Sequence, residues 1–151
     1  MPPLKGIDRG INGSLLKALE ETGHGDHIAI VDPSYSIPEG SRVIDYQGNS
    51  SARALKGILA LVPIEEESHV LLMMPDTEQH SHEAVTEFEE ALGGVRETDW
   101  LTRYGKDNPS GIGFYDLVNN PSNETQNTLF VRTRDEKAFA CAMLVVGHSQ
   151  S

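Results

Sequence analysis

The sequence predicts a single α/β domain, 1–151, in which helices cover a mostly buried sheet. Segments with apolar residues at helical spacing alternate along the chain with short, continuous apolar runs that are typical of buried strands. The 151 residues are enough for one hydrophobic core. A hydrophobic content of 38% and a charged content of 23% are ordinary for a globular fold. Together these observations favour a layered helix–sheet–helix arrangement.

The first half of the chain predicts two helices and three strands. A helix at 14–22 has leucines on one face, Ser14 as its cap and Gly23 as a left-handed end. A buried strand follows at 27–32 and stops at Pro33. The elements expected next are a strand at 42–46, a helix capped by Asn49 or Ser50 and stopped by Pro63, and a strand at 69–74.

The second half predicts a third helix at 81–92, with acidic residues outward and Gly93 at its end. The remaining expected elements are a strand at 99–104, a short helical turn at 114–119, and two strands at 128–134 and 138–146 about a turn at Asp135. Alternation of strands and helices is what a layered α/β domain requires.

Charge and composition exclude some classes of partner. The 12 basic and 23 acidic residues give a net charge of −11, which argues against a nucleic-acid partner and gives no attraction to an anionic membrane surface. No apolar run approaches the roughly 20 residues of a membrane helix, and no signal peptide is expected. The single cysteine, Cys141, cannot form an internal disulfide, so a cytoplasmic location is expected.

The densest polar cluster on a rigid frame is His24, Gly25 and Asp26, followed by Asp32. The first three residues follow a predicted helix, and Asp32 ends a predicted strand; loops at element ends collect ligand groups in α/β folds. A histidine can donate or accept a proton near neutral pH. A plain structural role, with His24 as a surface turn residue and Asp32 as a cap, fits the same spacing, and spacing alone favours it.

The chain closely resembles the ribose pyranase/fucose mutarotase family over its first half, and patchily after Gly94. The segments that carry the resemblance are LKGI at 4–7, LLKAL at 15–19, GHGD at 23–26, the strand that ends in Asp32, the stretch 54–63, LLMM at 71–74 and KAFA at 137–140. The leucine-rich helix followed by GHGD favours the fucose mutarotase branch over the ribose branch.

The resemblance implies an enzyme that interconverts anomers or ring forms of a free monosaccharide such as L-fucose. It implies His24 as the catalytic proton donor and Asp32 as a ligand of sugar hydroxyls. Arg103, before Phe114 and Tyr115, resembles the substrate-binding arginine of the family, although a surface arginine fits equally well. Acid/base ring opening needs no metal and no other cofactor, so none is expected.

The resemblance also implies a homo-oligomeric ring, a decamer being one size it suggests, with pockets near subunit contacts. The family ends with a strand that carries Tyr-x-Asn, whereas this sequence reaches Ser151 where that tyrosine is expected. This departure leaves three alternatives open: a catalytically inactive sugar-binding or regulatory protein of the same fold, a D-ribose pyranase, and a structural oligomer subunit. His80 and His82 share no helical face, so a metal site there is not predicted.

Overall fold

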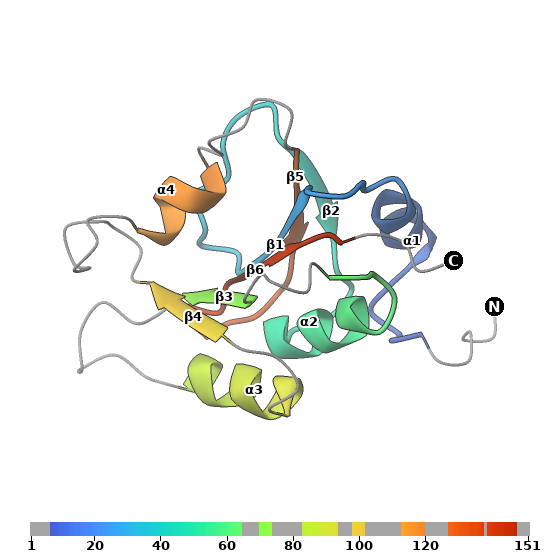
Figure 1. Ribbon diagram of the computed structural model, residues 1–151. Helices are drawn as coiled ribbons and strands as arrows, with labels where there is room; N and C mark the ends of the chain where they lie inside the picture. Colours follow the sequence, from blue (N-terminus) through green and yellow to red (C-terminus); the bar gives the residue numbers. More distant parts are fainter. Residues whose placement is uncertain are drawn as a thin grey trace.

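The protein folds around a mixed sheet with helices on both faces (Figure 1). The computed structural model describes residues 7–64, 70–73, 83–93, 98–101, 113–119, 127–137 and 139–147. Within these residues the sheet has six strands in the order β2-β5-β1-β6-β3-β4. The strands are β1 (His27–Val31), β2 (Arg42–Asp45), β3 (Val70–Met73), β4 (Thr98–Leu101), β5 (Thr128–Arg132) and β6 (Ala142–Val145). The predicted α/β class is confirmed.

Strand β6 lies in the middle of the sheet and is the strand that makes it mixed. It is antiparallel to β1 and to β3, whereas β5 is parallel to both of its neighbours, β1 and β2. The sequence predicted β5 and β6 about a tight turn, but β1 lies between them. Both central strands are buried on their two faces, as their continuous apolar sequences require.

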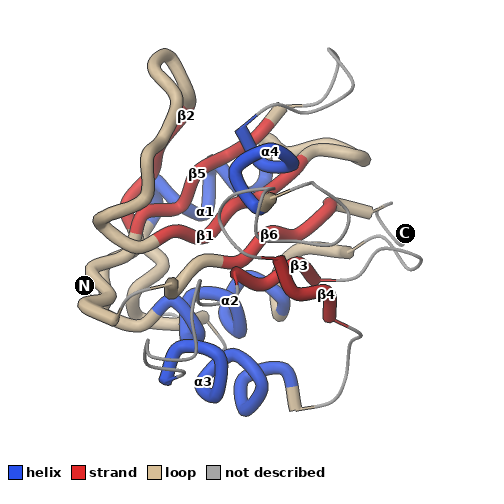
Figure 2. Tube along the Cα trace, turned by 90° about the vertical axis from the view of Figure 1, so that its left-hand side faces the viewer, coloured by secondary structure: helices blue, strands red, loops and turns tan. Residues whose placement is uncertain are grey.

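Four helices lie against this sheet: α1 (Gly13–Glu20), α2 (Ser51–Leu59), α3 (Glu83–Leu92) and α4 (Phe114–Asn119). Side chains of α1, α2 and α3 pack on one face, and those of α4 on the other. Figure 2 shows α2 and α3 on the opposite side of the sheet from α4. None of the helices in the described part of the chain is long and apolar enough to cross a membrane.

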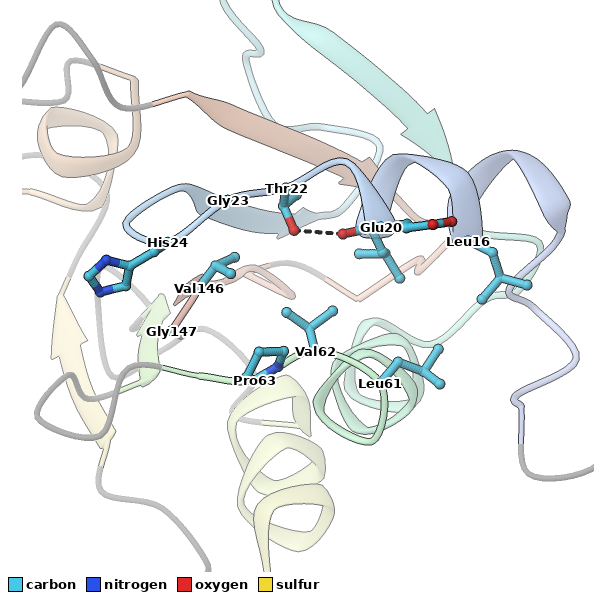
Figure 3. A pocket seen from close by; sticks show the side chains of 11 residues that line it. Leu16, Glu20, Thr22, Gly23, His24, Leu61, Val62, Pro63, Val146 and Gly147 are labelled. Carbon is cyan, nitrogen blue, oxygen red and sulfur yellow. Dashed lines mark hydrogen bonds between the residues drawn. The ribbon is translucent and has the colours of Figure 1, made fainter. Parts of the chain in front are cut away.

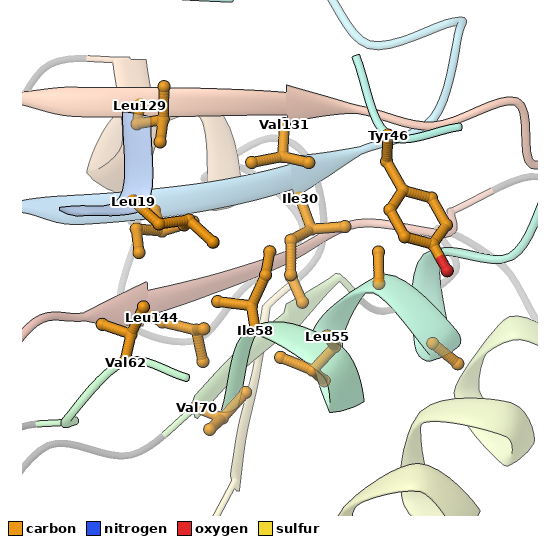
Figure 4. Close-up of a cluster of buried hydrophobic side chains, with 14 of the residues drawn as sticks. Leu19, Ile30, Tyr46, Leu55, Ile58, Val62, Val70, Leu129, Val131 and Leu144 are labelled. Carbon is orange, nitrogen blue, oxygen red and sulfur yellow. The ribbon is translucent and has the colours of Figure 1, made fainter. Parts of the chain in front are cut away.

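Two hydrophobic cores result from the alternation of side chains along β1. Ile28 and Ile30 face the three-helix side, where they pack with residues such as Leu55 (Figure 4). Ala29 and Val31 face the α4 side. Because successive side chains of a strand point to opposite faces, β1 contributes to both cores and fixes the residues at its two ends relative to them.

Local capping differs from the predictions in two places. The cap of α1 is Asn12, whose side chain accepts a 3.0 Å hydrogen bond from the Leu15 N–H, so the Ser14 prediction is wrong. The left-handed glycine is Gly25 (φ +89°), not Gly23. The predicted cap Ser50 and the left-handed Gly93 are confirmed.

Candidate functional site

A tight turn joins α1 to β1 and carries His24. The Asp26 carboxylate accepts a 2.8 Å hydrogen bond from the Gly23 N–H, and the Asp26 N–H donates to the Gly23 carbonyl at 3.0 Å. Gly25 has a positive φ that disfavours any side chain there, and its N–H donates to the Val146 carbonyl. The exposed His24 therefore sits on a turn that is tied to itself and to the end of β6.

His24 lies at one end of a cavity of about 660 Å³ (Figure 3). That volume is within the range of sites for small molecules. The cavity lies between α1, the chain that follows α2, and the end of β6; its lining residues are Leu16, Leu19, Glu20, Thr22, Gly23, His24, Leu61, Val62, Pro63, Val146 and Gly147. Its lining is mostly apolar, with polar groups confined to the segment that leads from α1 to His24.

Two polar side chains accompany His24 around the cavity. The Thr22 hydroxyl donates a 2.6 Å hydrogen bond to the Leu19 carbonyl at the end of α1, so its oxygen remains free to accept. Glu20 is exposed on the last turn of the same helix. The described residues contain no group of three histidine, cysteine, aspartate or glutamate side chains that could hold a metal ion. The chemistry available here is proton transfer and hydrogen bonding.

Asp32 lies at the other end of β1 from His24. Its side chain is 3% exposed. One carboxylate oxygen accepts hydrogen bonds from the N–H and hydroxyl of Ser34, at 3.0 and 2.8 Å, and the other accepts from the Ala140 N–H at 3.2 Å. The strand between them spans about 13 Å at roughly 3.3 Å per residue. One chain therefore does not bring His24 and Asp32 together.

Comparison with known proteins identifies the family. The model of the RbsD / FucU transport protein family matches residues 5–149, nearly the whole chain. The chain belongs to this family. RbsD/FucU proteins are sugar isomerases, namely mutarotases and pyranases, so the predicted resemblance is confirmed at this level.

Individual relatives are more distant than the family match suggests. The L-fucose mutarotases of Actinobacillus pleuropneumoniae serotypes 5b and 3 are each 42% identical over 66 residues, which is 42% of this chain and 44% of theirs. The match thus spans less than half the length of these curated relatives.

Solved structures of the RbsD/FucU family share the fold. The fucose mutarotase of Streptococcus pneumoniae in complex with L-fucose matches with a TM-score of 0.69 and 22% identity, over 97% of this chain and 100% of its own. RbsD of Bacillus subtilis complexed with D-ribose matches with a TM-score of 0.63 and 17% identity, over 93% and 95%. At these identities the comparison establishes the fold alone.

The expected last strand is present, but its residues differ from the family motif. We predicted that the chain ends before that strand; instead, β6 is in the sheet, and the match covers 100% of the fucose mutarotase chain. No Tyr-x-Asn occurs in the sequence. The residues that lead into β6 are Phe139, Ala140 and Cys141, all three buried.

Arg103 lies outside the described residues, so its predicted role stays a prediction. The short helix expected after it is present as α4, which buries Phe114. Sequence reasoning missed the wall of the cavity that Leu61 and Pro63 form opposite His24. No local pattern marks that wall, because it is made by the chain after α2 approaching α1 in space.

Proposed function

We propose that this protein is a sugar mutarotase that interconverts the anomers of L-fucose or a closely similar monosaccharide. The observation that carries the proposal is the position of His24, on a turn fixed by Asp26 and beside a cavity large enough for a monosaccharide. The family supports the reaction type, because its members are sugar isomerases. No metal or nucleotide is part of the proposal.

His24 acts as the acid that opens the ring. Its imidazolium gives a proton to the ring oxygen as the C1–O5 bond breaks, while the anomeric hydroxyl loses its proton to water and C1 becomes a carbonyl. Closure on the other face of the carbonyl reverses these transfers and returns the proton to His24. The side chain therefore needs access to solvent and to the sugar, and an exposed position at the end of the cavity supplies both.

The cavity wall supports a 6-deoxy sugar over ribose. Leu16, Leu61 and Pro63 line it with carbon, which suits the methyl group that L-fucose carries and D-ribose lacks. The L-fucose mutarotase relatives point the same way over the part that they match. We therefore propose fucose as the preferred substrate and a D-ribose pyranase as the less favoured alternative.

The working form proposed here is a cytoplasmic homo-oligomer. His24 and Asp32 lie at opposite ends of β1, so a site that uses both needs a second copy of the chain to bring them together. Arg103 is proposed as a further sugar ligand in that assembly. Sedimentation of the purified protein is expected to show an oligomer, and a monomer that remains active would contradict this part of the proposal.

Exchange between α and β anomers, followed by saturation-transfer NMR, tests the function. Wild type should accelerate exchange of L-fucose above the spontaneous rate, and more than it accelerates the ring interconversion of D-ribose. His24→Gln should lose this acceleration. Glu39→Gln, an exposed change far from the cavity lining, is the matched control and should keep it. No acceleration by wild type for any of these sugars removes the enzymatic proposal.

A sugar-binding protein without catalysis is the second candidate. The absence of Tyr-x-Asn before β6 favours it, because Phe139 and Cys141 cannot supply the same hydrogen bonds. This candidate predicts saturable fucose binding by calorimetry together with an unaccelerated anomer exchange. A purely structural subunit, the third alternative, predicts neither binding nor exchange.

A further inference from the structure

Asp32 is surrounded by donors from its own chain. Both its oxygens are engaged, one by Ser34 and the other by the Ala140 N–H at 3.2 Å, across 108 positions of sequence. The Cys141 thiol also lies against this carboxylate, which together with burial raises the pKa of the thiol well above its ordinary value. A carboxylate has about four acceptor positions, so little of this one is left for a ligand.

The segment that Asp32 reaches is the entry to β6, residues 139–141, and its backbone is strained. Phe139 has φ +63°, the left-handed region, and it is the only residue other than glycine with a positive φ among those described. Directly after it, the Cys141 N–H donates back to the Phe139 carbonyl at 3.0 Å, which makes a very tight turn. Such a conformation persists only where surrounding contacts enforce it.

Contacts on both sides hold this segment in place. The Cys141 carbonyl accepts a 3.0 Å hydrogen bond from the Met73 N–H, and the ring of Phe139 packs in the core on the α4 side. The Asp32 contact to Ala140 is the printed hydrogen bond that ties the middle of the turn to another element, the end of β1. Loss of that contact should release the left-handed residue first.

We propose that Asp32 is a positioning residue, which acts on the sugar site by holding the 139–141 segment rather than by accepting sugar hydroxyls itself. The carboxylate closes the turn after β1 through Ser34 and clamps the entry to β6 through Ala140. The link to sugar rests on the proposed function, because only there does the wall formed by this segment matter. The clamp itself is independent of that function and is measured separately.

Cys141 is the only cysteine and serves as a built-in reporter of the clamp. It is 1% exposed and lies within the clamped segment. In wild type, a thiol reagent should reach it only through global unfolding, so the labelling rate should rise steeply with urea. In Asp32→Ala, labelling in native buffer should be at least tenfold faster and nearly independent of low urea, which is the signature of local opening.

Three further variants make the comparison specific. Asp32→Asn keeps one acceptor oxygen and should label at an intermediate rate, as a partial rescue. Ser34→Ala leaves the Ala140 contact in place and should label like wild type. Ile58→Val, in the other core, lowers stability without touching the clamp, and its labelling should stay dependent on urea.

Anomer exchange separates positioning from direct binding. The exchange rate should fall across Ser34→Ala, Asp32→Asn and Asp32→Ala in the order in which labelling rises, and not in the order of melting temperature. The proposal is overturned if Asp32→Ala weakens fucose binding while Cys141 stays protected, or if its labelling follows global unfolding as in Ile58→Val. If Asp32→Ala does not fold, the same decision is made on Asp32→Asn against Ser34→Ala. Wild type without exchange activity would end the mutarotase proposal, whereas labelling would still decide the clamp.

Discussion

His27 and Thr128 are neighbours in register on the parallel strands β1 and β5, and neither His27 Nδ1 nor Thr128 Oγ1, both buried, has a hydrogen-bond partner. His27 is 9% exposed, and burial lowers the pKa of its imidazole from 6.5, although the nearby charge of Asp26 opposes that shift. Two polar groups are thus held dry at the start of the strand that follows His24.

The folded protein should lose stability as the pH falls below about 6.5, because the unfolded chain then binds a proton that the folded His27 resists. The loss continues down to the lowered pKa of the folded state and then stops. We expect the free energy of unfolding, measured with urea, to fall by about 1 kcal/mol more between pH 7.5 and 5.5 in wild type than in His27→Gln. An equal fall in both proteins would contradict this account.

Thr128→Val is the matched variant for the same pair. It replaces an unsatisfied buried hydroxyl with a methyl group of similar size, on a strand that suits valine. We expect it to stabilise the protein by about 1 kcal/mol at neutral pH without changing the pH dependence that His27 causes. A destabilised Thr128→Val would mean that the hydroxyl has a partner, such as a bound water.

Gly10 is required by the ring of Tyr46. A Cβ at position 10 would meet ring atoms of Tyr46 at 2.3 and 2.4 Å, and that ring is 2% exposed with its hydroxyl donating to Asp8 at 2.6 Å. Gly10→Ala should therefore destabilise the protein by about 2–3 kcal/mol through overpacking. Gly13→Ala, at the start of α1 with open space around its Cβ, should instead stabilise by about 0.5–1 kcal/mol. Urea denaturation of both variants tests the contrast, and equal effects would be inconsistent with it.

Asp135 joins the start of α2 to the chain after β5. Its buried carboxylate accepts from the Ser51 N–H at 2.9 Å, from the Lys137 N–H at 2.9 Å and from Lys137 Nζ at 3.1 Å. Asp135→Ala leaves these donors without a partner and should cost about 3 kcal/mol of unfolding free energy. The exposed neighbour variant Glu136→Gln should stay within about 0.5 kcal/mol of wild type. A small effect at Asp135 would show that water replaces the carboxylate.

Asp26 shapes the turn that presents His24. Asp26→Ala removes the acceptor of the Gly23 N–H, so anomer exchange should fall about tenfold although His24 is intact. Asp26→Asn keeps an acceptor oxygen and should recover most of the rate. Saturation-transfer NMR on both variants, with melting temperatures as the control for stability, decides this. Full activity in Asp26→Ala would show that His24 needs no fixed turn.

Most of the fold was predictable because its elements carry local signals. Continuous apolar runs marked the buried strands, and leucines at helical spacing marked α1. The caps were harder to place: Asn12 begins α1 in place of Ser14, and Gly25 takes the positive φ in place of Gly23. Neighbouring residues offer equivalent caps, and which one serves depends on where the chain turns in three dimensions.

The sequence by itself determined the fold class, the family and His24 as the candidate acid, because these depend on local patterns and on the GHGD segment. Only the tertiary structure decided that β1 lies between β5 and β6, and that His24 and Asp32 are at opposite ends of it. It alone showed that the Asp32 carboxylate is filled by Ser34 and Ala140. The reason is physical: pairing of strands and burial of a carboxylate depend on segments more than one hundred positions apart, and no local pattern records which of them meet.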